Sequence, residues 1–182
     1  MFATHPEMEA LARKECQAVA AASDGGIIGW KSLGELKYTT AFIQETLRLH
    51  PTITIIAPRA CVQGDHVPMS DGKSIFTTKY WSQPDEFVPE RFLEGTAPFE
   101  ADKALRNGQG NSYTYLPFST GPKNCIGMRF AMAELQVVIS NLLLQFSFRL
   151  TDKANVNPRL DGVSLKPVHL SMTIHSVAAS SH

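Results

Sequence analysis

Residues 115–127, YLPFSTGPKNCIG, place one cysteine, Cys125, among glycines and prolines directly before a long apolar stretch. A cysteine binds metal as the thiolate, so a metal site must favour the anionic sulfur. A helix starting near residue 127 would supply unpaired N–H groups and a partial positive charge. Gly121 and Gly127 allow backbone angles that direct N–H groups towards the sulfur, and they leave room for a flat ligand. The segment therefore predicts that Cys125 is a metal ligand.

Cys125 has no second cysteine or histidine beside it in the sequence. This argues against an iron–sulfur cluster and against a structural zinc site. A single thiolate fits a metal whose other ligands come from a cofactor, and haem is the obvious candidate. Phe118 is placed to shield such a site from water. The alternative is a buried structural cysteine at the start of a helix, which is common.

Phe118, Gly121, Cys125 and Gly127 follow the spacing F-x-x-G-x-x-x-C-x-G, which resembles the haem-binding loop of the cytochrome P450 family, the haem-thiolate monooxygenases. Two more segments are similar to that family and occur in the same order. ETLR at residues 45–48 resembles its E-x-x-R helix, and FVPERF at residues 87–92 resembles its P-E-R-F segment. The E-x-x-R pattern alone is uninformative, because ion pairs at i,i+3 are common on helix surfaces. The three segments together are specific.

The resemblance implies haem b (iron protoporphyrin IX) as the cofactor, with Cys125 as the axial ligand of the iron. It assigns no residue of this chain to catalysis. Lys123 stands where the family usually has arginine or histidine; it can still pair with a haem propionate, but without bidentate geometry. The implied cofactor-binding residues are Cys125, Phe118, Gly121, Gly127, Arg59 and Lys123.

Glu45 and Arg48 lie in a segment with Phe42 and Leu47 that is apolar on most sides, so the pair is predicted to be buried. A buried ion pair persists only where its remaining donors and acceptors are satisfied. Arg91 of the PERF segment is the natural third member, because its planar fork can bind Glu45 or nearby carbonyl groups. In the resembled family this trio locks the core behind the haem loop. We therefore expect a structural role rather than a chemical one.

Two further segments fall where members of the resembled family line the substrate pocket, although both are equally consistent with ordinary core. Lys123 and Arg129 would contribute to a face that receives an acidic redox partner, or to a solvated surface. The implied partners are a small apolar organic substrate, O2, and NADPH electrons delivered by a flavoprotein reductase. The candidate pocket residues are Thr52, Thr54, Ile55, Ile56 and, near the C-terminus, residues 162–165 with Val163 and Ser164.

The implied reaction inserts one oxygen atom from O2 into an apolar substrate. The resemblance starts at the segment His5-Pro6-Glu7, so residues 1–182 are expected to be a partial domain, the C-terminal portion of the family fold. The helix that activates oxygen in the family would lie before it. We therefore expect a fragment of a monooxygenase that is not catalytically competent alone. The alternatives are a non-catalytic haem-binding remnant and a haem-free domain with a structural cysteine.

Composition bounds the other function classes. The 182 residues carry 17 basic and 17 acidic side chains, and this balance gives no support for a nucleic-acid partner. The three cysteines are an odd number without a C-x-x-C pair, so a disulfide framework is not expected. No signal peptide is apparent, and the apolar stretch 130–146 is too short and too polar to be an anchor. The resemblance implies the endoplasmic reticulum membrane for the full-length protein, reached through a preceding segment.

The predicted fold class is α+β and mainly helical, the C-terminal part of the P450 fold with small β-sheets around a cysteine loop. A capping box, Thr4 to Glu7, is predicted to open a helix that reaches about residue 22. A second capping signal, Ser32 to Glu35, is predicted to open a short helical turn. The other expected elements are a helix over 40–50, short strands over 53–78, a surface loop over 94–114, a helix over about 127–146, and strands over 146–150 and 168–177.

Overall fold

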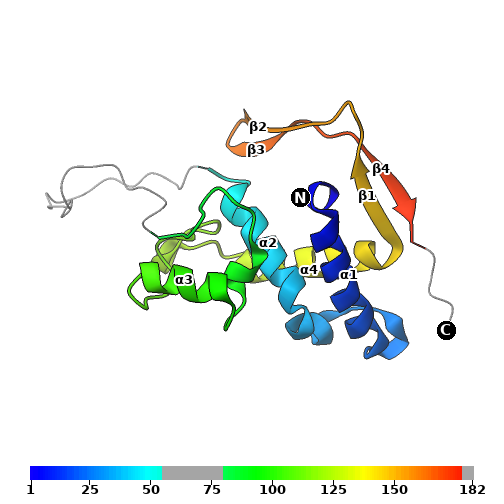
Figure 1. The fold of residues 1–182 in the computed structure, drawn as a ribbon, viewed down its shortest axis with the longest axis horizontal. Helices are drawn as coiled ribbons and strands as arrows, with labels where there is room; N and C mark the ends of the chain where they lie inside the picture. Colours follow the sequence, from blue (N-terminus) through cyan, green and yellow to red (C-terminus); the bar gives the residue numbers. More distant parts are fainter. Residues whose placement is uncertain (55–79, 178–182) are drawn as a thin grey trace, which may run out of the picture.

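The computed structural model describes residues 1–54 and 80–177 (Figure 1). Over these residues the chain is mainly helical with two separate two-stranded antiparallel sheets, which confirms the α+β prediction. Most of the strands predicted between residues 53 and 78 lie outside this part. The helices are α1 (Pro6–Ala21), α2 (Lys37–Leu49), α3 (Ala97–Leu105) and α4 (Met128–Gln145), and the strands are β1 (Phe146–Leu150), β2 (Asn155–Asp161), β3 (Ser164–His169) and β4 (Met172–Ser176).

The first helix starts one residue later than its predicted capping box, Thr4 to Glu7, would place it. His5 occupies the N-cap position without a side-chain cap, and Pro6 is the first helical residue. Thr4 instead belongs to a 3₁₀-helix, η1 (Phe2–Thr4), and its Oγ1 donates to the carbonyl oxygen of Met1 at 2.7 Å. The capping box is therefore wrong, although the predicted helix is confirmed. Proline suits this first position because its missing N–H would have no partner there.

The N-terminus of α2 is capped from α1 rather than from its own segment. The Glu15 carboxylate accepts from the backbone N–H groups of Tyr38 at 2.7 Å and Thr39 at 2.8 Å. These N–H groups lack intrahelical partners, so the carboxylate satisfies them. Its negative charge also interacts favourably with the positive end of the helix dipole. The short helical turn predicted at Ser32 to Glu35 is present as the 3₁₀-helix η3 (Trp30–Glu35), but Ser32 does not cap it. The turn begins two residues earlier without a side-chain cap, and the Ser32 hydroxyl shares a hydrogen bond with Ser23.

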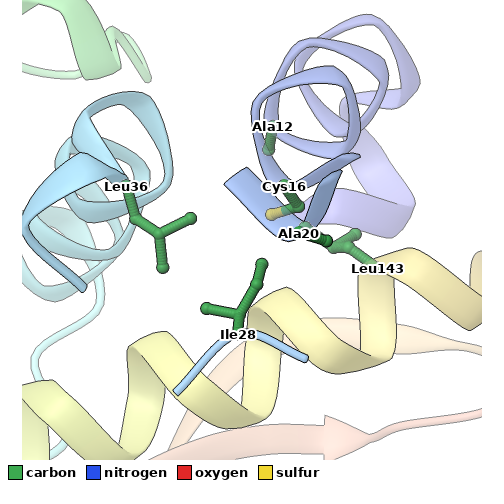
Figure 2. Packing of buried hydrophobic residues seen from close by; sticks show 6 residues of the cluster. All are labelled: Ala12, Cys16, Ala20, Ile28, Leu36 and Leu143. Atoms are coloured by element: carbon green, nitrogen blue, oxygen red, sulfur yellow. The ribbon is translucent and has the colours of Figure 1, made fainter. Parts of the chain in front are cut away.

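The main hydrophobic cluster lies between α1, α4 and the segment that joins α1 to α2. Figure 2 shows these side chains pointing towards one another, with the Cys16 sulfur inside the cluster. Cys16 is completely buried, so this cysteine is a packing residue. The members are Ala12, Cys16, Ala20, Ile28, Leu36 and Leu143.

Helix α4 confirms the helix predicted for the apolar stretch. Two of the polar residues that interrupt this stretch bind neighbouring elements. Gln136 Nε2 donates to Thr40 Oγ1 at 2.6 Å, and Asn141 Nδ2 donates to the carbonyl oxygen of Ile28 at 3.2 Å. Among the described helices, none is long and apolar enough to cross a membrane.

The two sheets follow α4 directly. Strand β1 pairs with β4, from Phe146 opposite Ser176 to Leu150 opposite Met172. Strands β2 and β3 form a hairpin whose turn contains Gly162 at φ +61°. The strand predicted over 146–150 is confirmed, whereas the one predicted over 168–177 divides between the end of β3 and β4. Strand β2 was not predicted.

The surface loop predicted over 94–114 is wrong, because it contains α3. The Oγ1 atom of Thr96 caps this helix by accepting from the N–H of Phe99 at 3.3 Å. Pro98 lies in the first turn, where proline is tolerated. The helix ends at residues with left-handed backbone angles, Asn107 at φ +54° and Gly108 at φ +77°. Local capping thus outweighs the polar composition that favoured a loop.

Candidate functional site

The cysteine loop is closed by hydrogen bonds within its own backbone. The N–H of Cys125 donates to the carbonyl oxygen of Phe118 at 2.8 Å, across the base of the loop. Inside the loop, the N–H of Asn124 donates to the carbonyl oxygen of Gly121 at 3.1 Å. This bond lies within a turn that includes the 3₁₀-helix η6 (Gly121–Lys123). Cys125 therefore stands on a defined turn immediately before α4, as the sequence predicts.

Gly121 and Gly127, the two glycines of the F-x-x-G-x-x-x-C-x-G spacing, have different roles in this loop. Gly121 has φ +75°, a left-handed angle that other residues adopt at a cost. Gly127 occupies the N-cap position of α4 with an ordinary φ of −86°. A Cβ atom at Gly127 would lie 3.9 Å from the Cys125 sulfur, so this glycine keeps one side of the sulfur free of a side chain. Gly121 shapes the loop, whereas Gly127 leaves space next to the thiol.

The thiol of Cys125 is free and exposed, unlike that of Cys16. Two large apolar side chains that follow it in the sequence, Ile126 and Phe130, are exposed as well. Lys123 is exposed, while Phe118 is only partly buried and does not fully shield the sulfur. An accessible thiol with apolar neighbours and a glycine-lined approach fits a flat apolar cofactor that takes one protein ligand.

A metal held by protein side chains alone has little support in the described part of the chain. No group of three or more histidine, cysteine, aspartate or glutamate residues there could hold an ion. Arg59, the predicted partner of a haem propionate, lies outside the described residues, and the structure does not test it.

The predicted trio of Glu45, Arg48 and Arg91 is brought together in the interior. Glu45 is completely buried, and both of its oxygens accept from arginine. Arg48 Nε lies 2.6 Å from Glu45 Oε2, and Arg91 Nε lies 3.0 Å from Glu45 Oε1. Since Arg91 lies in the 3₁₀-helix η5 (Pro89–Phe92), the pairs join α2 to the PERF segment.

The remaining polar atoms of the trio are satisfied by backbone groups. Arg48 donates to the carbonyl oxygens of Pro84 at 2.6 Å and Glu86 at 3.0 Å. Glu45 also accepts from the N–H of Val88 at 2.8 Å. A buried ion pair is stable only when its other hydrogen bonds are made, and these contacts meet that requirement. The network fastens residues 84–92 to α2.

Sequence reasoning missed one member of this network, Asp102 on α3. Arg91 Nη1 lies 2.6 Å from Asp102 Oδ2, and both side chains are buried. Ser82 donates to the other oxygen of Asp102 through its N–H at 2.6 Å and its hydroxyl at 2.5 Å. Thr96 and Pro98 could have revealed the helix that carries Asp102, but no local signal identifies its distant partner.

The charge network is linked to the segment that leads into the cysteine loop. The ring of Phe92, next to Arg91, lies 5.0 Å from the ring of Tyr115. The Tyr115 hydroxyl donates to the carbonyl oxygen of Gln44 on α2 at 3.2 Å. Burial raises the pKa of Tyr115, and the Glu45 charge raises it further. Tyr115 is thus packed beside the network, three residues before Phe118.

The two segments predicted to line a substrate pocket meet each other. The N–H of Leu165 donates to the carbonyl oxygen of Thr52 at 2.8 Å, and Ile53 forms an isolated antiparallel bridge with Ser164. Thr54 and Val163 are exposed, while Ile55 and Ile56 lie outside the described residues.

A separate apolar cavity of about 460 Å³ lies between the N-terminus, α2, α4 and the strands. Of the candidate pocket residues that are described, only Leu165 reaches it; Thr54, Val163 and Ser164 do not. The other apolar residues that line the cavity are Met1, Phe2, Ala3, Ile139, Leu142, Leu143, Phe148, Leu150, Val156, Pro158, Pro167, Leu170 and Met172.

Comparison with known proteins agrees with this arrangement. A family model described as Cytochrome P450 matches residues 1–174. The chain is 36% identical over 152 residues to cytochrome P450 4d2 of Drosophila melanogaster, covering 78% of this chain and 28% of that relative. It is 35% identical over 176 residues to cytochrome P450 4A10 of Rattus norvegicus, covering 91% of this chain and 32% of that relative.

A plant relative gives a similar match. Tabersonine 16-hydroxylase 2 of Catharanthus roseus is 34% identical over 148 residues, which cover 74% of this chain and 27% of that protein. The matched part thus spans about a third or less of the length of these curated relatives. Because the family match extends over nearly the whole chain, and the cysteine loop and the ETLR and PERF segments lie within it, the chain belongs to the cytochrome P450 family.

Proposed function

We propose that this chain is part of a haem-thiolate monooxygenase in which Cys125 is the axial ligand of the haem iron. The observation that carries the proposal is the free, exposed thiol of Cys125 on a closed turn before α4, in a chain of this family. When bound, haem b supplies the iron at which O2 is reduced for insertion of one oxygen atom into the substrate. The electrons would come from NADPH through a flavoprotein reductase.

The residues of the loop hold the cofactor in different ways. Gly121 and Gly127 shape the turn and leave space beside the sulfur, which allows a flat ring to approach the main chain. Phe118 lies at the base of the loop, where its carbonyl oxygen fixes the position of Cys125. Lys123, exposed on the same loop, and Arg59 pair with the propionates.

The substrate in this proposal is a small apolar organic molecule. One relative is named a hydroxylase, which supports oxygen insertion as the reaction. We assign substrate contact to Thr54, Val163 and Ser164. The contact between Thr52 and Leu165, which brings their two segments together, supports this assignment. We also propose that the full-length protein is located at the endoplasmic reticulum membrane.

The 182-residue chain by itself is expected not to catalyse the reaction. Cys125 is exposed, so haem bound to this chain would be open to water, whereas oxygen chemistry of this kind needs a closed, dry site. This exposure favours a second candidate function, haem binding without turnover. Reductase-dependent product formed by the isolated chain from an apolar substrate panel would exclude that second candidate.

The test of ligation is the reduced carbon monoxide spectrum of the chain after addition of haem. We expect a thiolate-type band from the wild-type chain and its loss in Cys125→Ala, since no other thiol occupies the loop. Cys16→Ala and Cys61→Ala are the controls and should keep the band. A Cys125→Ala variant that retains the thiolate-type band would overturn the assignment.

A further inference from the structure

Asp102 is buried, and both of its carboxylate oxygens accept hydrogen bonds. One oxygen receives the Arg91 guanidinium at 2.6 Å. The other receives the N–H of Ser82 at 2.6 Å and its hydroxyl at 2.5 Å. Burying a carboxylate is costly unless it is paired and fully hydrogen-bonded, and Asp102 meets both conditions. It is therefore an integral member of the interior network rather than an incidental contact of α3.

The charges around Trp81 show why the network needs this carboxylate. The guanidinium carbons of Arg48, Arg91 and Arg106 lie 5.5, 5.8 and 5.0 Å from the centroid of the buried Trp81 ring. Among the described residues, Glu45 pairs with Arg48 and Arg91, and Asp102 brings a second buried carboxylate to this cluster. Burial lowers the pKa of Arg106, the Asp102 charge opposes this change, and the Arg91 charge adds to it. Asp102 thus offsets repulsion among crowded guanidinium groups.

Two contacts of Tyr115 link the network to the segment that leads into the cysteine loop. Arg91 is followed by Phe92, whose ring packs 5.0 Å from that of Tyr115. Tyr115 is anchored to α2 through its hydroxyl and leads directly into residues 116–125. The position of Arg91 is set by Glu45 on one side and Asp102 on the other. A change at Asp102 would release one of these two restraints.

We infer that Asp102 is a positioning residue for Cys125: it completes the Glu45–Arg48–Arg91 network and so holds the segment that presents the haem-ligating loop. Asp102 does not touch the cofactor in this account. It acts through Arg91, Phe92 and Tyr115. The inference rests on the proposed function, because the geometry it controls is that of the thiolate ligand.

The test is Asp102→Asn in the 182-residue chain, which removes the charge while it keeps the size of the side chain. We expect the apparent haem affinity to fall roughly tenfold, as for outer-shell substitutions at metal sites. The reduced carbon monoxide complex should also shift from the thiolate-type band towards the thiol-type band while circular dichroism remains native. Asp161→Asn is the matched control, because Asp161 is an exposed partner of Lys166 and should leave both readouts unchanged.

Two more variants keep the test decisive if Asp102→Asn does not fold. Asp102→Glu restores the charge and should recover most of the thiolate-type band. Ser82→Ala removes one hydrogen bond to Asp102 but keeps the charge, and should give a smaller loss of haem affinity in the same direction. If Ser82→Ala and the folded Asp102 variants behave as wild type, the inference is overturned.

The failure of the inference can be distinguished from failure of the proposed function. A wild-type chain that gives a thiolate-type band, lost in Cys125→Ala but unchanged in Asp102→Asn, rejects only the positioning role of Asp102. A wild-type chain without any thiolate-type band rejects the proposed function and the inference together. A band shift in folded Asp102→Asn, reversed in Asp102→Glu, supports both.

Discussion

The N–H of Leu165 donates to the carbonyl oxygen of Thr52 at 2.8 Å, and this contact joins the segment that follows α2 to the β2–β3 hairpin. The neighbouring bridge between Ile53 and Ser164 extends the contact by one residue. Figure 1 shows the hairpin reaching back over the helices to the segment that follows α2. The two segments predicted from the sequence to contact substrate, around residues 52–56 and 162–165, are therefore adjacent where they are described, at residues 52–53 and 164–165.

This adjacency predicts a disulfide between Ile53→Cys and Ser164→Cys. Residues opposite each other in an antiparallel pair have Cα atoms about 4.5–5.5 Å apart, within the range that a disulfide spans. With Cys61 and Cys125 replaced by serine, mild oxidation should cross-link the pair, as measured by intact mass and by mobility on non-reducing gels.

The matched control for this cross-link combines Ile53→Cys with Val168→Cys. Val168 is exposed on the same strand but lies four residues beyond Ser164, roughly 13 Å away at ~3.3 Å per residue. It should not cross-link within the same time. Equal yields from the two pairs would contradict the bridge.

The elements with strong local patterns were the ones that sequence could predict. The long apolar stretch predicted α4 nearly to its ends, and the ETLR and PERF segments predicted residues that meet as ion pairs. Strand β2 was missed because every residue in it is exposed and Pro158 interrupts it, so no alternation of apolar and polar residues marks it. Its strand character comes from pairing with β3.

Tertiary contacts account for the other differences. The cap of α2 comes from Glu15 on α1, and no pattern near residue 37 could have revealed it. Asp102 looks like one more charge in a polar segment until the fold brings Arg91 to it. The exposure of Cys125 likewise depends on which elements cover the loop, and local sequence carries no such information.

Glu45→Gln should lower the free energy of unfolding by roughly 3–5 kcal/mol, because it leaves two buried guanidinium groups without their shared carboxylate. Urea unfolding followed by circular dichroism measures this loss, and in cells it would show as poor accumulation of the folded chain. Asp161→Asn again serves as the control, since its ion pair with Lys166 is exposed and its loss should hardly change stability. A Glu45→Gln chain of normal stability, in an enzyme that turns over slowly, would indicate a catalytic role instead.

Tyr38→Phe should stabilise the chain by about 1 kcal/mol, because the buried Tyr38 hydroxyl has no hydrogen-bond partner among the described residues. Burial raises the pKa of this phenol to about 12, with smaller contributions from Glu90, Glu7 and Glu15. Between the ordinary value of ~10 and this raised value, the unfolded chain loses the proton first. Stability should therefore fall as the pH rises through this range, and Tyr38→Phe should reduce the slope in urea titrations.

Tyr115→Phe is the control for Tyr38→Phe, because the Tyr115 hydroxyl has a hydrogen-bond partner. Its hydroxyl donates to the carbonyl oxygen of Gln44 at 3.2 Å, so its removal should cost about 0.5–1.5 kcal/mol. If both substitutions changed stability in the same direction, the difference between a satisfied and an unsatisfied hydroxyl would not explain the data.

The two described cysteines should differ strongly in their reaction with a disulfide reagent. Cys125 is exposed, whereas Cys16 is fully buried and its pKa is raised by burial. In a Cys61→Ser chain, Cys125 should react rapidly, and the reaction of Cys16 should be slower by roughly 10³-fold or more. Cys16 becomes accessible only when the chain unfolds.

Haem should then abolish the fast reaction, since a thiolate bound to iron is no longer free to attack the reagent. Iron-free protoporphyrin is the matched control: it has the same ring and propionates but offers no metal to the sulfur, so it should protect Cys125 far less. Peptide mapping identifies which cysteine is modified in each case. Equal protection by the two compounds would mean that the ring merely covers Cys125, and the proposed iron–sulfur bond would be rejected even if haem binds to this loop.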